Sequence, residues 1–267
     1  MSKKELNIKQ NEDYLMKRLN KAKDINDKID ILRKLAQYKN KSSLDVMETY
    51  SNHEHEYVRE AVAELLSRYK NERSKCLLRE ALNDKSSFVR KAAVESLGIL
   101  RDENSISHLL RLLEDKDEIV RIEVVESIGI IGDVKAEKPL INVMKNDKSS
   151  LVRGCAAIAL SDIESKKAKN AIKEQLKIES QGHSKLRMNV ALYMMGEEEA
   201  LFDILIYLKS RYYRLRCAAV NSLSCITNDE NKNTIMDAIA GLQRKEKTRA
   251  VKSSINDFLE CHTLMND

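Results

Sequence analysis

Apolar residues recur along this chain with the spacing of amphipathic helices, and the pattern is clearest in residues 115–147. Val120, Val124, Val125 and Ile128 fall on one face of a helix in this stretch. A break that contains two glycines follows, and then a second apolar stripe begins. The stretch therefore predicts two helices joined by a short turn.

The same pattern recurs at a nearly fixed period. Each copy is marked by an apolar residue followed by Arg, with small or apolar residues three, four and seven positions after the Arg. Successive markers are 31, 31, 32, 34 and 29 residues apart, and Arg249 marks a weaker seventh copy. Self-similarity at such a period indicates a helical repeat protein. The six clear markers are Val58-Arg59, Val89-Arg90, Val120-Arg121, Val152-Arg153, Leu186-Arg187 and Leu215-Arg216.

The repeated unit resembles HEAT repeats, in particular the short type found in phycobilisome lyase-like proteins. The copies that carry the resemblance start at Asp84, Asp115 and Asp147, and the segment Ile128–Ile141 is the most similar. The resemblance covers roughly residues 42–260. It implies an all-α fold, a right-handed α-solenoid (superhelix) of about seven to eight HEAT-like helical pairs. It indicates little about function, because the family includes scaffolds, lyases and oxygenases.

The repeats divide the chain into three regions. Residues 1–41 match the pattern poorly, so we expect an N-terminal segment with capping helices, the first of which starts near Asn11 after a frayed stretch. Residues 42–262 are predicted to form the repeat solenoid. Residues 263–267 are predicted to be a loose C-terminus.

The composition bounds the class of protein. One Pro, seven Gly and no Trp in 267 residues favour helix throughout. No apolar stretch is long enough for a signal peptide or a membrane span, so we expect a cytoplasmic protein without a membrane partner. The five cysteines are odd in number and scattered, which indicates free thiols. They are Cys76, Cys155, Cys217, Cys225 and Cys261.

The charge pattern leaves nucleic-acid binding as an alternative. The net charge is only +5, and interspersed opposite charges are typical of a solvated surface. Two local groups are more basic, and phosphate binding would require their side chains to line up on one face. The first group is Lys166, Lys167, Lys169, Lys173 and Lys177, and the second is Lys209, Arg211, Arg214, Arg244, Lys245 and Lys247.

A structural ladder is expected along the repeats. An acidic residue lies six positions before the repeat Arg in the central copies, where neighbouring Arg side chains and backbone donors can hold its carboxylate. Such charge-assisted bonds contribute on the order of 1–3 kcal/mol. His53, Gln181 and Ser210 occupy the equivalent positions elsewhere, so the ladder should weaken toward both ends. The predicted ladder residues are Asp84, Arg90, Asp115, Arg121, Asp147 and Arg153.

We expect no enzyme, and hence no catalytic residue, cofactor or metal site. Relatives such as the deoxyhypusine hydroxylases hold iron with His-Glu pairs inside several helices, whereas this chain has only His53-Glu54 and His55-Glu56 ahead of one helix. Two His in a turn are more typical of capping than of metal binding. HEAT-like DNA glycosylases rely on aromatic residues that include Trp, which this chain lacks. A phycobilin-lyase-type enzyme stays an alternative that the resemblance implies.

The second helix of each pair is expected to line a concave groove. Positions one, two and five residues after the repeat Arg point into that groove, which makes its first half acidic and its second half apolar. Such a groove suits a basic, partly apolar segment of a protein partner, although a Glu column is also an ordinary solvated helix face. We therefore predict a non-enzymatic scaffold or adaptor. Its predicted partner-binding residues are Glu60, Glu64, Glu95, Glu123, Glu126, Ile158, Met188 and Leu192.

Overall fold

The computed structural model describes residues 3–165 and 167–263, with the side chains of residues 9–165 and 167–262. All regular structure in these ranges is helical, as helices α1 to α16 and three short 3-10 turns. The chain separates into two compact units, residues 1–133 and residues 134–267. The predicted all-α fold of repeated helical pairs is confirmed.

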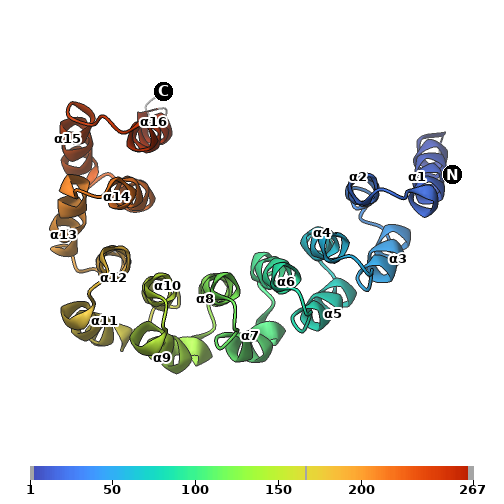
Figure 1. Cartoon of the computed structure of the whole chain (residues 1–267), viewed down its shortest axis with the longest axis horizontal. Coiled ribbons are helices and arrows are strands. Elements are labelled where there is room, and N and C mark those ends of the chain that lie inside the picture. The colour runs from blue at the N-terminus through green and yellow to red at the C-terminus, as the bar shows by residue number, and fades with distance from the viewer. Residues whose placement is uncertain (1–2, 166, 264–267) are drawn as a thin grey trace. The chain divides into compact units, whose positions relative to one another are not determined.

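The first unit contains α1 to α8 in two layers (Figure 1). The even-numbered helices form one layer, in which α2 packs on α4, α4 on α6 and α6 on α8. The odd-numbered helices form the other layer alongside them (Figure 1). The helices are α1 (Lys3–Lys21), α2 (Ile25–Leu35), α3 (Lys41–Tyr50), α4 (Glu56–Leu66), α5 (Glu72–Ala81), α6 (Ser87–Ile99), α7 (Ile106–Leu112) and α8 (Glu118–Ile131).

The second unit repeats this arrangement with α9 to α16. Here α10 packs on α12, α12 on α14 and α14 on α16. The helices are α9 (Glu137–Asn146), α10 (Ser150–Asp162), α11 (Ala168–Ile178), α12 (Gly182–Met194), α13 (Ala200–Ile206), α14 (Tyr213–Ile226), α15 (Lys232–Gln243) and α16 (Arg249–Thr263). The short turns η2 (Val134–Ala136) and η3 (Tyr207–Lys209) lie in this unit, and η1 (Glu103–Ser105) lies in the first.

Two ends of the chain differ from the sequence prediction. Helix α1 begins at Lys3, well before the expected start at Asn11, so the frayed stretch predicted there is wrong for its described part. At the other end, α16 reaches Thr263. The rest of the predicted loose C-terminus, residues 264–267, lies outside the described residues.

Helix α8 shows how the sequence builds one repeat. The Asp117 side chain accepts a hydrogen bond from the backbone N–H of Ile119 (3.0 Å) and caps the helix start. Val120 and Val124 are fully buried, as the apolar stripe predicts. The helix ends where Gly132 adopts a left-handed conformation (φ 83°), which a residue with a Cβ adopts only at a cost.

Small residues let neighbouring even-numbered helices approach closely. Ser96 on α6 donates a hydrogen bond to the carbonyl of Ala63 on α4 (2.8 Å), and Ser127 on α8 donates to Val94 on α6 (3.1 Å). A Cβ on Gly98 would lie only 2.6 Å from the Ser127 Oγ. These contacts fix the register between successive repeats, so equivalent residues form rows across the layer.

The structure corrects the register of the fifth copy. In the other copies the marker Arg lies four residues after the helix N-cap, as Arg90 does after Ser86. The N-cap of α12 is Gln181, so Lys185 holds the marker position and Arg187 lies two residues beyond it. The weaker seventh marker, Arg249, is the exposed first residue of α16 and is also out of register.

None of the helices in the described part of the chain is both long enough and apolar enough to span a bilayer. All five cysteines are free thiols, and among them only Cys155 is buried.

Candidate functional site

Arginine–carboxylate ion pairs join successive even-numbered helices within each unit. In the first unit, Arg90 on α6 donates from Nε and Nη2 to the two carboxylate oxygens of Asp115, at 2.7 and 2.8 Å. The same arginine donates through Nη1 to the carbonyl of Asp84 (2.9 Å). Asp115 also accepts from the backbone N–H of Asp117 at the start of α8 (2.9 Å). We call each such ion pair a rung of the ladder. Each rung joins one even-numbered helix to the N-terminus of the next even-numbered helix.

The carboxylate of each rung lies two residues before a helix N-cap. Arg59 pairs in the same bidentate way with Asp84 (2.7 and 2.9 Å). The two side chains of the Arg90–Asp115 rung are only 7% and 5% exposed, so the pair is shielded from water. Burial raises the pKa of Asp115, but the hydrogen bonds from Arg90 and from the Asp117 N–H outweigh it and hold that pKa below its usual range.

In the second unit the ladder uses glutamates that the sequence prediction missed. Arg153 pairs with Glu179 (2.7 and 2.9 Å), and Arg216 pairs with Glu246 (2.7 and 3.0 Å). The hydrogen bonds from these arginines lower the pKa of Glu179 and of Glu246 to about 2. The expected partner position, Gln181, is wrong because the register of α12 is shifted by two residues.

The other predicted ladder residues keep their local contacts. Arg121 donates through Nη1 to the carbonyl of Asp115 (2.9 Å) and is buried. Asp147 accepts from the backbone N–H of Ser149 (2.7 Å), and its carbonyl accepts from Arg153 (2.8 Å). Both therefore occupy the register positions that the sequence predicts.

Two rungs lack a carboxylate. His53 takes that position before α4, where its Nδ1 accepts from the backbone N–H of His55 (3.0 Å) and its Nε2 lies 3.4 Å from Lys28 Nζ. Burial, and then the charge of Lys28, lower the pKa of His53. Ser210 takes the position before α14, and its Oγ accepts from the backbone N–H of Tyr212 (3.2 Å). In the complete rungs the residue at the marker position pairs with the carboxylate of the next repeat. The corresponding two residues here are Lys185 and Ser210.

The first unit presents a row of carboxylates on the outer face of its even-numbered layer. The positions nine residues after the N-caps of α4, α6 and α8 are Glu64, Glu95 and Glu126. Glu64 and Glu95 are exposed, and Glu126 is half-buried. Glu60 and Glu123, also half-buried, lie beside this row. The predicted acidic residues are thus brought together within one unit.

One lysine lies among these five carboxylates. Lys91 on α6 pairs with Glu95 (3.0 Å) and approaches Glu123 on α8 (3.5 Å). Burial is the main cause of a raised pKa at Glu123, and the charges of Glu95 and Glu126 add to it. Burial and the nearby Glu64 raise the pKa of Glu60 in the same way. Negative charge is therefore in excess on this face.

Exposed apolar side chains flank the carboxylates, which the sequence prediction missed. Tyr57, Phe88 and Ile119 lie two residues after the N-caps of α4, α6 and α8, and they are 52%, 51% and 57% exposed. This position precedes the Glu row by seven residues, close to two helical turns, so both rows lie on the same face. Ile99 and Ile130 are exposed near the other ends of α6 and α8.

The predicted apolar half of the groove is wrong. Met188 is fully buried and Leu192 is 4% exposed, so neither side chain can contact a partner. In the corrected register they lie three and seven residues after Lys185, which are core positions of the repeat. Ile158 is half-buried because it packs against the hydrophobic core of the second unit.

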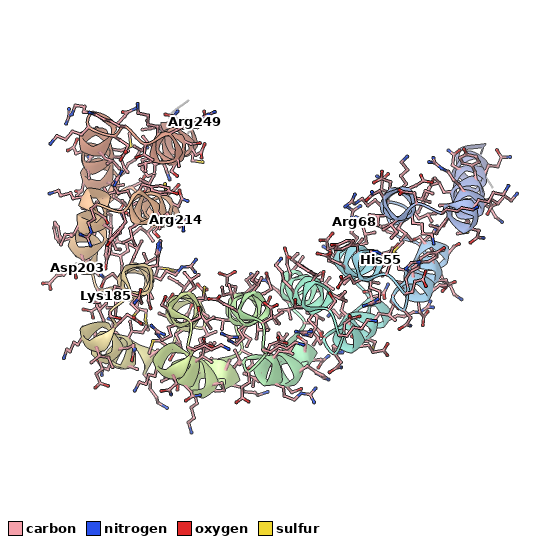
Figure 2. All side chains as sticks on the ribbon, viewed as in Figure 1. His55, Arg68, Lys185, Asp203, Arg214 and Arg249 are labelled. Carbon is pink, nitrogen blue, oxygen red and sulfur yellow. The ribbon has the colours of Figure 1, made fainter. Side chains whose placement is uncertain are left out.

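The described residues contain no group of three or more His, Cys, Asp or Glu side chains placed to hold a metal ion. The His53 ring accepts from the backbone N–H of His55 in the turn before α4, and the His55 side chain makes no capping hydrogen bond. The all-side-chain view shows polar and charged groups spread over both layers (Figure 2).

Sequence comparison matches the family model described as HEAT repeats to residues 12–98, 71–129 and 106–191. These matches overlap and together span more than half of the chain. No curated protein matches the sequence of the chain.

Solved structures share the fold at low sequence identity. The complex of CpcE and CpcF of phycocyanin lyase from Nostoc sp. PCC7120 is similar with a TM-score of 0.59 and 17% identity, over 81% of this chain and 94% of that chain. The Escherichia coli protein YibA is similar with a TM-score of 0.55 and 20% identity, over 97% of each chain. At these identities the likeness shows the fold alone.

Proposed function

Because this chain belongs to the family of HEAT-repeat proteins, we propose that it is a non-enzymatic scaffold or adaptor and that its first unit binds a segment of a protein partner. The binding surface is the open face of α4, α6 and α8. One observation carries the proposal, namely the parallel rows of carboxylates and exposed apolar side chains on that face. We call this surface the acidic–apolar face.

The acidic–apolar face defines the chemistry of its partner. Lysine or arginine side chains would pair with Glu64 and Glu95, and an apolar side chain would pack on Phe88 or Tyr57. Single exposed apolar residues are ordinary on protein surfaces, but three of them in register at consecutive repeats form a patch. A basic and partly apolar segment therefore fits this face.

The repeat spacing adds a constraint on the segment. Adjacent packed helices are about 8–10 Å apart, whereas an extended chain advances about 3.3 Å per residue. An extended segment that crosses α4, α6 and α8 would thus place one residue in three over each successive helix. A partner with basic and apolar residues at roughly that period would engage all three repeats.

Electrostatics supports a steering role for the carboxylates. Glu60 and Glu123 have raised pKa values, mainly because of burial and in addition because of nearby carboxylates, whose effect the charge of Lys91 opposes. A cationic segment would relieve this repulsion and accelerate association, and added salt would screen the effect. The apolar side chains would mainly set the lifetime of the complex.

The test is comparative capture from a lysate of the source cells treated with nuclease. The wild-type chain, the variant Glu64→Lys/Glu95→Lys and the control variant Glu80→Lys/Glu114→Lys would be used as bait, with quantitative mass spectrometry. The control has the same change of charge at exposed positions on α5 and after α7.

We expect a protein that the wild type and the control retain equally and that Glu64→Lys/Glu95→Lys loses at least tenfold. Its binding segment should carry basic and apolar residues. Equal capture by all three baits, with all three folded by circular dichroism, would contradict binding at the acidic–apolar face.

A further inference from the structure

The net positive charge of the chain belongs entirely to its second unit. Residues 1–133 contain 25 Lys and Arg and 25 Asp and Glu, whereas residues 134–267 contain 22 and 17. The two units therefore differ in electrostatic character although they share one fold. A surface of the second unit that gathers this excess would attract anions.

Three lysines of the first basic group found in the sequence lie against carboxylates. Lys169 and Lys173 both pair with Glu197, at 2.8 Å each. Lys167 lies 3.8 Å from Glu137. Lys166 lies outside the described residues. Three lysines of this group thus already lie against carboxylates, which makes the group a weaker candidate for anion binding than the second one.

Three residues of the second basic group, together with Arg249, lie at the amino-terminal edge of α14 and α16. Arg211 and Arg214 flank the start of α14, and Lys247 and Arg249 flank the start of α16; all four are exposed. The two edges adjoin, because Arg216 of α14 binds Glu246 and Thr248 immediately before α16. Lys185, Arg214 and Arg249 lie on consecutive even-numbered helices (Figure 2).

The residue type at one register position changes partway through the second unit, because this position is still apolar in α10, as Leu151. The residue two positions after the N-cap is apolar in α4, α6 and α8, but it is His183 in α12 and Arg214 in α14. Burial and the positive charges of Arg187 and Arg214 hold the pKa of His183 below its usual range. A positive potential therefore replaces the apolar row at this edge.

A cavity of about 640 Å³ lies between the starts of α12 and α14. His183, Arg211 and Arg214 line it, and its lining contains no acidic residue. Tyr212 and Tyr213 also line it and are 55% and 43% exposed. The Arg211 guanidinium lies 4.6 Å from the centre of the Tyr212 ring, and the Arg214 guanidinium lies 6.0 Å from the centre of the Tyr213 ring, so each tyrosine of the wall is paired with a neighbouring arginine.

The incomplete rung of the ladder is linked to this cavity through the chain, because Ser210 directly precedes Arg211 in the cavity wall. Lys185 occupies the marker position of α12, and the carboxylate that would face it is replaced by Ser210, the neighbour of Arg211. In the described part of the chain, Lys185, Arg211 and Arg214 form no ion pair with an acidic side chain. In neighbouring repeats a carboxylate neutralises the cation at the marker position, whereas the positive charge of Lys185 stays available for a ligand.

We infer that this edge of the second unit is a binding site for single-stranded nucleic acid. The phosphodiester groups contact Arg211 and Arg214 in the cavity and continue toward Lys247 and Arg249. Bases stack on Tyr212 and Tyr213. The site is separate from the acidic–apolar face and does not depend on the function proposed for it.

Two features favour a nucleic-acid strand over an acidic peptide. The cations extend past the cavity to the next helix, which suits a ligand with a charge on every residue. The exposed tyrosines offer flat stacking partners, as proteins that bind single strands without sequence preference do. A phosphorylated or acidic peptide would use the cations and gain little from the rings.

The test is fluorescence anisotropy of a labelled 20-nucleotide oligo(dT) or oligo(U) with the full chain. Arg211→Ala/Arg214→Ala should weaken binding about tenfold and reduce the salt slope of log K by about 1.4, the amount expected for two lost single-strand phosphate contacts. The control Arg68→Ala/Lys70→Ala removes two exposed cations from the first unit and should leave binding unchanged. Tyr212→Ala should weaken binding about 5- to 100-fold.

A second variant separates site chemistry from folding. Ser210→Asp supplies the missing carboxylate, so it should pair with Lys185, raise the melting temperature and weaken oligonucleotide binding. Loss of binding in a more stable protein cannot be a folding defect.

Three results would overturn the inference. One is no binding of either oligonucleotide at low salt, and another is equal binding by Arg211→Ala/Arg214→Ala and its control. The third is tighter binding of a phosphoserine peptide that the Tyr212→Ala change does not affect. Glu64→Lys/Glu95→Lys should bind the oligonucleotides as the wild type does, so the two proposals fail or succeed separately.

Discussion

Asp115→Ala should destabilise the first unit more than any surface substitution. The change removes both oxygens that hold Arg90, at 2.7 and 2.8 Å, and the acceptor for the Asp117 N–H at 2.9 Å. Arg90 keeps only its contacts to the carbonyls of Asp84 and Lys85. A guanidinium that is 7% exposed is then left without a counter-charge.

The magnitude follows from that burial. Removal of one partner from a buried ion pair costs about 3–5 kcal/mol, and an exposed pair costs less than about 1 kcal/mol. The carbonyl contacts that Arg90 keeps favour the lower end, so we expect about 3 kcal/mol. With a urea m-value of about 2 kcal/mol/M, the midpoint should fall by about 1.5 M.

Urea unfolding followed by circular dichroism at 222 nm measures this shift. Glu114→Ala is the matched control, because it removes an exposed carboxylate next to Asp115 and should change stability by less than about 0.5 kcal/mol. Asp115→Asn keeps an acceptor for the Asp117 N–H and should fall between the two. Equal midpoints for Asp115→Ala and Glu114→Ala would refute the stabilising role of the ladder.

Three further predictions concern the second unit and the acidic–apolar face. Glu179 and Glu246 have folded-state pKa values of about 2 against an ordinary 4.5, which corresponds to about 3 kcal/mol of folding stability each. This stability should be complete above pH 4.5 and be lost as the pH falls toward 2. In an acid titration, the folding stability of Glu179→Gln should therefore fall less than that of the wild type. Glu123→Gln should raise the thermal midpoint slightly at pH 7, because the raised pKa of Glu123 shows that its ionised form is disfavoured in the folded chain; an unchanged or lower midpoint in calorimetry would contradict this. Met188→Ser should cost about 2–4 kcal/mol in urea unfolding because the side chain is fully buried, whereas a surface position would show almost no change.

The helical repeat could be predicted from the sequence because its signal is redundant. Apolar spacing, the marker Arg and the period of 31 or 32 residues agree in several copies, so each confirms the others. The carboxylates of α4, α6 and α8 were predictable for the same reason. They lie at fixed positions in copies that match the pattern closely.

The errors came from copies that depart from the pattern. The spacings of 34 and 29 residues around Arg187 were the signal of a wrong register, because Lys185 restores spacings of 32 and 31. An Arg two residues beyond the true position, with an apolar residue before it, imitated the marker. The wrong register assigned Met188 and Leu192 to the groove instead of the core. It also assigned the ladder position to Gln181 instead of Glu179.

The exposed apolar row was missed for a different reason. Tyr57, Phe88 and Ile119 fit the hydrophobic pattern of a helix start, and only packing shows that no neighbour covers them. Likewise, the sequence places Arg211 and Lys247 far apart, and the pairing of Arg216 with Glu246 brings their helices together. Surface rows of this kind depend on tertiary contacts that periodicity alone does not specify.

Site-directed photo-crosslinking tests the acidic–apolar face most directly. A benzophenone side chain at Ile99 lies one helical turn beyond Glu95 on α6 and leaves every carboxylate of the face in place. The same group at Glu80 on α5 serves as the control position. Our account predicts that irradiation in nuclease-treated lysate links position 99, and not position 80, to a protein segment rich in basic and apolar residues. Adducts from position 80 alone, or equal adducts from both positions, would contradict it.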